Sequence, residues 1–251
     1  MKIFYRISES TNSQHAEART WQVKLPNATK RNCLLNVMEC FPTAHITIFV
    51  DSITEDTWKW LTSLDRVRII KIEAGSDAKS MRVLLDQAIQ IEDDKEIILF
   101  QEDDYLYLPG AEHKIIESLQ YAHYSTGYLH PDKFWHPSRG GNPYTPMDNV
   151  SEPTQVIKTS DHFWMVTNST TNTFATTVGT MKEDIDTWMW GTDDLINTKD
   201  FAIFLKLREK GRALVQPIPS LATHCLKGFE APLVGLDIKS WEDIQPLTSP
   251  I

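Results

Sequence analysis

The hydrophobic pattern of the first part of the chain predicts strands and helices in turn. Runs rich in β-branched and aromatic residues predict strands at 2–7, 45–50, 66–72 and 96–100. Apolar residues at helical spacing predict helices at 33–41, 53–64 and 78–90, with a cap for the first helix at 27–29. The polar stretch 8–30 predicts a loop up to that cap. This alternation indicates βαβ units around a parallel sheet.

The pattern changes after Pro109 and Gly110. A helix is predicted at 111–122, followed by long loops at 128–153, where Pro, Gly, Asn and aromatic residues are frequent. Two short strands are predicted at 161–167 and 173–178, and a helix at 197–210 that Gly211 ends. No internal repeat or linker is visible. We therefore expect one domain over 1–251, with a first half at about 1–108, a second at about 109–226 and a tail at 227–251.

Composition and charge narrow the classes of function. The 251 residues are 41% hydrophobic and 24% charged, which is ordinary for a globular protein. The formal net charge of -9 argues against a nucleic-acid partner, because such proteins carry basic surfaces. A nucleotide ligand is not excluded, since one metal ion can offset local acidity.

The cysteines and the apolar runs bear on the compartment. Cys33, Cys40 and Cys225 fit neither a zinc site nor a redox pair, which favours free thiols in a reducing compartment. The first residues turn polar too quickly for a signal peptide. No apolar run reaches the ~18 residues that a membrane span needs. We expect a cytoplasmic protein with no membrane span.

The clearest chemical signal is the triplet Glu102-Asp103-Asp104, directly after an apolar strand. Ligands of open α/β sheets bind at the carboxyl ends of strands. Clustered carboxylates repel one another and favour a compensating cation, and oxygen ligands suit Mg²⁺ or Mn²⁺. The alternative is a solvated acidic turn, as expected for the same triplet at 92–94.

A second signal is the helix predicted near residue 200. Phe201, Phe204, Leu205 and Arg208 share helical spacing, so one face packs on the core and Asp200 lies in the first turn. Asp200 is either a general base at a rigid position or a carboxylate that complements the helix dipole. Downstream, His224 is either a ligand or a structural histidine.

Taken together, these segments resemble the GT-A glycosyltransferases, in particular the family-two-like group. The stretch from Leu99 to Asp104 is similar to the D-x-D motif that follows a buried strand in that group. Lys199-Asp200-Phe201 and the helix up to Gly211 are similar to its E-D pair and amphipathic helix. Pro217, Pro219 and His224 are similar to its Pro-containing strand and histidine.

The resemblance implies an α/β fold of the GT-A type: a Rossmann-like nucleotide-binding half with a mostly parallel central sheet, and a smaller acceptor-side half. It also implies a Mn²⁺ or Mg²⁺ cofactor, a nucleotide-sugar donor, and a carbohydrate or other hydroxyl acceptor. The metal ligands would be Asp104, Glu102 and His224, and the base Asp200. The nucleotide-sugar site would contain Arg6, Ile7, Ser8, Asp51, Ala78, Arg82, Glu102 and Asp103.

Three departures from the group's pattern leave alternatives open. Glu102 replaces the first acid of D-x-D, and Lys199 replaces the first acid of the E-D pair. The usual Gly-Ser signature after the second strand is replaced by the stretch 51–54. The pair Asp193 and Asp194 therefore rivals Asp200 as the base.

The expected activity is metal-dependent transfer of a sugar from a nucleoside diphosphate, with UDP as the group's most frequent nucleotide and inversion at the anomeric carbon. Aromatic residues within 128–144 and at 188–190 are either acceptor-binding or core residues. One alternative is a sugar nucleotidyltransferase, which usually has a Gly-rich stretch where 8–12 has no glycine. The other is a non-catalytic sugar- or nucleotide-binding module.

Overall fold

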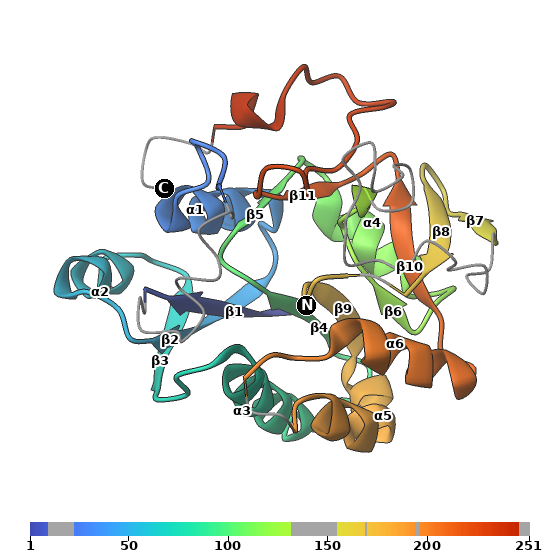
Figure 1. Cartoon of the computed structure of the whole chain (residues 1–251), viewed down its shortest axis with the longest axis horizontal. Helices are drawn as coiled ribbons and strands as arrows, with labels where there is room; N and C mark the ends of the chain where they lie inside the picture. The colour runs from blue at the N-terminus through green and yellow to red at the C-terminus, as the bar shows by residue number, and fades with distance from the viewer. Residues whose placement is uncertain (10–22, 132–154, 169, 194–195, 246–251) are drawn as a thin grey trace.

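A nine-stranded mixed sheet forms the centre of the protein over the residues that the computed structural model describes, 1–9, 23–131, 155–168, 170–193 and 196–245. Its first part is parallel and consists of β3 (Val67–Ile72), β2 (His45–Asp51), β1 (Lys2–Ser8) and β4 (Ile97–Gln101), in that order. Next to β4 comes β9 (Phe174–Thr177), which is antiparallel to it. The sheet continues with β6 (Tyr124–Ser125), β10 (Leu214–Ile218), β8 (Phe163–Thr167) and β7 (Val156–Lys158), as Figure 1 shows.

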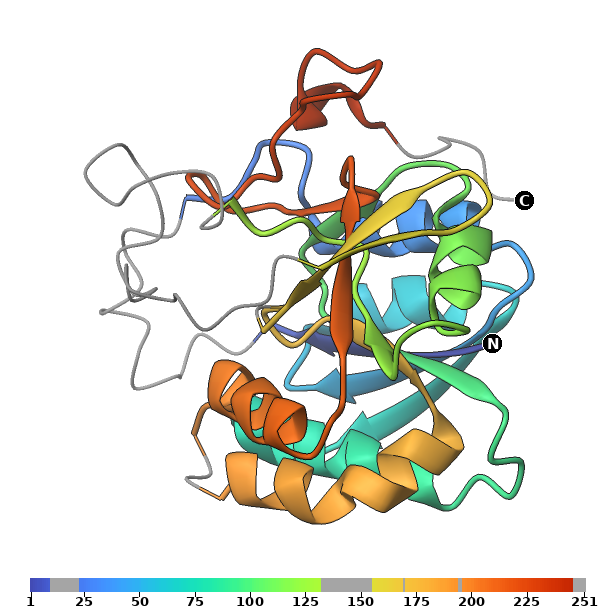
Figure 2. The same cartoon turned by 90° about the vertical axis from the view of Figure 1, so that its right-hand side faces the viewer.

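Helices cover both faces of this sheet. One face carries α1 (Lys30–Cys40), α2 (Glu55–Thr62) and α4 (Ala111–Ser118), together with a small antiparallel pair, β5 (Tyr105–Tyr107) and β11 (Ala222–His224). The other carries α3 (Asp77–Ile89), α5 (Val178–Gly191) and α6 (Asp200–Glu209) (Figure 2). Because both faces are covered, the central strands are apolar on both sides. Ile3 and Tyr5 of β1 pack on the first face and Phe4 on the second.

The order of the strands creates a switch point beside β1. The chain runs from β1 to β2 and β3 on one side, and then returns through α3 to place β4 on the other side of β1. In open α/β sheets the crevice at such a point, at the carboxyl ends of the strands, is where ligands bind. Ser8 at the end of β1 and Glu102 after β4 lie at this edge. The fold class predicted from the sequence, α/β with a mostly parallel, Rossmann-like central sheet, is confirmed.

The structure differs from the sequence prediction most clearly at α5. Pattern alone indicated no helix at 178–191, because Gly179, Thr180 and Thr187 are poor helix formers there. Tertiary packing decides instead: Trp188 is fully buried and stacks on Phe174, with ring centroids 4.4 Å apart. Trp188 is therefore a core residue and not an acceptor-binding aromatic.

The remaining differences concern short elements. The pattern did not predict β5, β6, β7 or β11, and these strands have three, two, three and three residues. Helix α4 ends at Ser118, earlier than predicted, and a 3-10 turn (η3, Trp241–Asp243) lies in the tail. Over the described part of the chain, every helix is too short or too polar to span a membrane.

Candidate functional site

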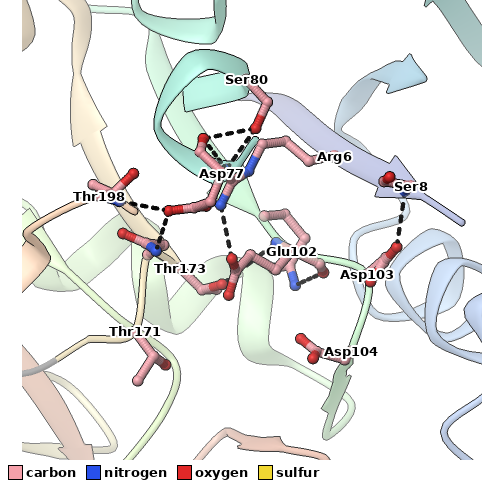
Figure 3. A network of polar contacts seen from close by, with 12 residues as sticks. Arg6, Ser8, Asp77, Ser80, Glu102, Asp103, Asp104, Thr171, Thr173 and Thr198 are labelled. Atoms are coloured by element: carbon pink, nitrogen blue, oxygen red, sulfur yellow. Dashed lines mark hydrogen bonds and ion pairs between the residues drawn. The ribbon is translucent and has the colours of Figure 1, made fainter. Parts of the chain in front are cut away.

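Arg6 is the third residue from the end of β1, and it lies at the centre of the polar network at the switch point. Its Nη1 donates to Asp77 Oδ1 at 2.6 Å and to Ser80 Oγ at 2.9 Å, and its Nη2 donates to Glu102 Oε1 at 2.8 Å. Figure 3 shows the guanidinium between the two carboxylates. Arg6 is only 8% exposed. Burial works against its charge, but Asp77 and Glu102 outweigh it and raise the pKa of Arg6.

Asp77 connects this network with the second half of the chain. It follows the cap residue Ser76 at the start of α3, and its Oδ2 accepts from the Thr198 amide at 2.7 Å and from Asn172 Nδ2 at 3.5 Å. Burial would raise the pKa of Asp77, but the Arg6 charge and the Thr198 amide lower it overall. Asp77 is therefore a stable anion that joins β1, α3 and the segment before α6.

Glu102 has the opposite electrostatic balance. Burial, assisted by the neighbouring carboxylates of Asp104, Asp77 and Asp103, raises the pKa of Glu102 well above its usual value, although Arg6 opposes the shift. Because its Oε1 accepts from Arg6, Glu102 is held towards β1. Its amide donates to Thr173 Oγ1 at 3.4 Å, which ties the turn after β4 to β9.

Asp103 and Asp104 point to other partners. Asp103 Oδ2 accepts from the Ser8 amide at 3.2 Å and from Lys30 Nζ at the start of α1. Asp104 Oδ2 lies 3.3 Å from His224 Nε2 and 3.4 Å from Lys24 Nζ. Burial would raise the pKa of Asp104, but His224 and the lysines lower it well below the usual range. The His224 ring stacks on Tyr105 at 5.0 Å, so β5 and β11 together orient it.

The donor atoms around Asp104 fit part of a metal shell. Asp104 Oδ1 is buried without a hydrogen-bond partner, and Oδ2 is 3.3 Å from a histidine nitrogen. Adjacent ligands of an octahedral ion with bonds of about 2.1 Å lie about 3 Å apart. Within the described ranges, no three His, Cys, Asp or Glu side chains form a metal-holding group. The structure thus brings Asp104 and His224 together, whereas Glu102 pairs with Arg6.

Asp51 lies at the end of β2 and is 7% exposed. Its Oδ2 accepts from the Gly75 amide at 2.7 Å, and its Oδ1 accepts from Ser52 Oγ at 3.1 Å. The cap of α2 is Thr54, whose hydroxyl accepts from the Thr57 amide. Asp51 is therefore not a helix cap; it connects the end of β2 with the loop that leads into α3.

The other predicted nucleotide-site residues have different surroundings. Ile7 is buried in the core beneath the site, and Ala78 is buried in the first turn of α3. Arg82 points to the end of α5, where it donates to the carbonyl oxygens of Thr192 at 3.1 Å and Met189 at 2.9 Å. Arg82 thus satisfies carbonyl groups that a helix end leaves without partners.

Asp200 begins α6, close to the Arg6 network. Burial raises the pKa of Asp200, and the charge of Asp77 adds to this shift, while the Phe201 amide and His130 oppose it. Its rival Asp193 is half exposed and pairs with Lys199 at 2.9 Å. Asp194 lies outside the described residues, as do most aromatic residues expected on the acceptor side, those at 134–136 and 144.

Four polar residues of this site were not predicted from the sequence: Lys24, Lys30, Asp77 and Ser80. The signal for Asp77 was available, since Ser76-Asp77 is a typical helix start after a strand. The lysines had no comparable signal, because both lie in a polar stretch with no periodicity. Only the return of this stretch to the end of β4 brings them to Asp103 and Asp104.

Comparison with known proteins gives matches in structure alone. No family model matches the chain, and no curated protein matches its sequence. The galactosyltransferase LgtC, in complex with donor and acceptor sugar analogues, is 10% identical with a TM-score of 0.45, over 82% of this chain and 70% of that chain. Residues 1–349 of S. aureus TarS are 13% identical with a TM-score of 0.49, over 86% and 57%.

A synthase is also among the similar structures. The 4-diphosphocytidyl-2C-methyl-D-erythritol synthase from Anaerococcus prevotii DSM 20548 is 11% identical with a TM-score of 0.47, over 86% of each chain. At this level of similarity, no activity or residue role is transferred from these proteins.

Proposed function

We propose that this protein is a glycosyltransferase that moves a sugar from a nucleoside diphosphate sugar to an acceptor hydroxyl. The observation that carries the proposal is one polar site at the switch point. Arg6 from β1, Asp77 from α3 and Glu102 after β4 form one network, with the Asp104–His224 pair beside it. Asp77 reaches Thr198, two residues before Asp200. Side chains of the kinds that hold a charged ligand and accept a proton thus come from elements that meet at the carboxyl ends of β1 and β4, which supports the proposal.

Asp200 is the proposed general base. An acceptor hydroxyl has to lose its proton as its oxygen attacks the anomeric carbon, and a positioned carboxylate can take that proton. Its raised pKa makes Asp200 a better proton acceptor than an ordinary aspartate. Its place in the first turn of a packed helix holds it in one position. Direct attack of this kind inverts the anomeric centre.

Asp104 and His224 are the proposed protein ligands of a divalent cation, with phosphate oxygens and water as the remaining ligands. When bound, Mg²⁺ or Mn²⁺ would neutralise charge that develops on the leaving diphosphate. One or two protein ligands plus substrate phosphates are a usual arrangement for Mg²⁺. Asp51 and the end of β1 are the proposed contacts of the nucleoside, and UDP is the first donor nucleotide to test.

The test is a screen of nucleotide sugars that detects the released nucleoside diphosphate, with Mn²⁺ and with EDTA. Transfer or slow hydrolysis that releases nucleoside diphosphate supports the proposal. A sugar nucleotidyltransferase would instead consume a nucleoside triphosphate and a sugar phosphate and release pyrophosphate. Binding of nucleotide sugars without any turnover would indicate the non-catalytic module.

A further inference from the structure

Each carboxylate after β4 already has a basic partner within the protein. Glu102 pairs with Arg6 at 2.8 Å, Asp103 with Lys30, and Asp104 with Lys24 at 3.4 Å. Lys24 lies in the segment before α1, and Lys30 is the first residue of α1. The acidic cluster is therefore accompanied by a row of cations. Lys24 and Lys30 would therefore lie beside any ligand that binds at the turn after β4.

The lysines differ from Arg6 in their freedom to accept a second partner. The Arg6 side chain is 9% exposed and makes four hydrogen bonds, so it is a fixed part of the fold. The Lys30 side chain is 28% exposed and that of Lys24 is 42% exposed. An ammonium group has three N–H donors, so each lysine can keep its aspartate and still donate to a ligand from the solvent side.

The first turn of α1 adds positive charge at the same place. It begins with Lys30 and Arg31 and contains no acidic residue. Cations at a helix N-terminus are unfavourable, because the helix dipole is positive there. Arg31 is directed to Asp56, but Lys30 is directed to the acidic turn. An anion bound next to the first turn of α1 would interact favourably with both the N-terminus of α1 and Lys30.

Backbone hydrogen bonds hold Lys24 beside the proposed metal ligands, and a side-chain contact holds Lys30 there. The Leu25 amide donates to the Cys225 carbonyl at 3.0 Å, and the Cys225 amide donates to the Asp104 carbonyl at 2.9 Å. The segment that carries Lys24 is thus bonded to the residue after His224, which is bonded in turn to the acidic turn. On the other side, Asp103 Oδ2 accepts from both the Ser8 amide and Lys30.

We infer that Lys24 and Lys30 bind the diphosphate of the donor and stabilise it as it leaves. This inference rests on the proposed function and adds two residues to it. A leaving diphosphate carries growing negative charge next to four carboxylates, namely Asp77, Glu102, Asp103 and Asp104. Without nearby cations these carboxylates would repel it. The ammonium groups of Lys24 and Lys30 are positive charges that lie next to the turn after β4 and are also accessible to solvent.

Calorimetry with three probes tests the inference: a nucleoside diphosphate, the corresponding nucleoside, and inorganic pyrophosphate, each with EDTA and with Mn²⁺. We expect Lys24→Ala and Lys30→Ala to weaken binding of the nucleoside diphosphate and of pyrophosphate by about tenfold each, and to spare the nucleoside. Lys182→Ala is the matched control. Lys182 pairs with Asp94 at 2.7 Å, is 34% exposed and lies away from the crevice, so its loss should change none of the three affinities.

A paired substitution separates contact with phosphate from simple neutralisation of the acids. If Lys30 only neutralises Asp103, Lys30→Ala combined with Asp103→Asn restores pyrophosphate affinity, and the inference is overturned. If Lys30 contacts phosphate, the double variant stays weak. Lys24→Gln and Lys30→Gln, checked by circular dichroism, replace an alanine variant that does not fold.

The outcomes also separate this inference from the proposed function. Unchanged diphosphate affinity in the Lys24→Ala/Lys30→Ala protein, with a wild type that binds nucleoside diphosphate, overturns the inference alone. A wild type that binds neither nucleoside diphosphate nor pyrophosphate overturns both.

Discussion

At the residue scale, Asp200 is the group whose charge state controls the proposed reaction. Burial and the nearby charge of Asp77 raise its pKa above the ordinary value of about 3.9 for aspartate. A general base works only when it is deprotonated, so activity is present above this raised pKa and is lost as the pH falls through it. We therefore expect kcat to decline on acidification at a higher pH than it would with an ordinary aspartate as the base. The measurement is kcat as a function of pH.

Asp200→Asn should lower kcat by roughly 10²-fold or more and leave the affinity for the donor unchanged. Asp193→Asn is the control, because Asp193 is half exposed and paired with Lys199, and it should transfer normally. Normal transfer by Asp200→Asn, with a loss in Asp193→Asn or Asp194→Asn, would move the base to that pair.

Asp51 is the second residue with a distinct prediction. If its carboxylate contacts the nucleoside, Asp51→Ala should raise the dissociation constants of the nucleoside diphosphate and of the nucleotide sugar alike, by about tenfold or more. Thr54→Ala is the control: it removes the actual cap of α2, costs about 1 kcal/mol of stability and spares binding. An Asp51→Ala protein that melts at a lower temperature but binds both ligands normally would show that Asp51 has only a structural role, through its hydrogen bond with the Gly75 amide.

At the scale of elements, the close approach of α5 and α6 sets the position of Asp200. Gly191 ends α5, and a Cβ at this position would lie 2.1 Å from Ile203 Cγ1 of α6. Only glycine allows this distance. The register between the two helices, and hence the place of the first turn of α6, depends on it. Arg82 reinforces the same junction from α3 through the carbonyl groups at the end of α5.

Gly191→Ala should lower the free energy of unfolding by about 1–3 kcal/mol, the usual cost of an overpacked contact. Urea denaturation measures this loss. In an Ile203→Ala background the clashing atoms are absent, so the same substitution should be neutral or slightly stabilising. A full loss of stability in both backgrounds would show that the clash with Ile203 is not the cause.

At the scale of the whole molecule, the C-terminal segment closes over the residues before α1. Trp241 is 3% exposed and donates from Nε1 to the Ala231 carbonyl at 2.8 Å. Asn27 Nδ2 donates to the carbonyls of Trp241 and Ile244, at 3.0 and 2.8 Å. The tail is thus part of the main core, and it supports the segment that carries Lys24 and Lys30.

Trp241→Ala should destabilise the protein by about 3–5 kcal/mol, as expected when a large buried aromatic is removed. Trp190→Ala is the comparison, because Trp190 is 39% exposed and contacts Lys206 on the surface, so it should cost about 1 kcal/mol or less. Equal losses for the two variants in urea denaturation would contradict the assignment of Trp241 to the core.

Local pattern was sufficient for the elements that bury a regular face. The four parallel strands and helices α1, α2, α3 and α6 follow from runs and spacings within a few residues of their observed bounds. The place of Glu102 to Asp104 at a strand end followed in the same way, because a buried strand and the acids after it are adjacent in the chain. These features depend on interactions between near neighbours, which a single sequence displays directly.

Tertiary structure alone decided the features that depend on distant residues. Helix α5 forms despite weak local propensity, because burial of Trp188 against Phe174 outweighs it. The network of Arg6, Asp77 and Glu102 joins residues up to 96 positions apart, and the pairing of Asp104 with His224 spans 120. Lys24 and Lys30 become part of the site only because the segment before α1 and the first turn of α1 return to the end of β4. The sequence by itself determined the four parallel strands, helices α1, α2, α3 and α6, and the acids that follow a strand. Helix α5 and the charges that meet at the carboxyl ends of the strands were decided by the tertiary structure, because they depend on contacts between residues far apart in the chain.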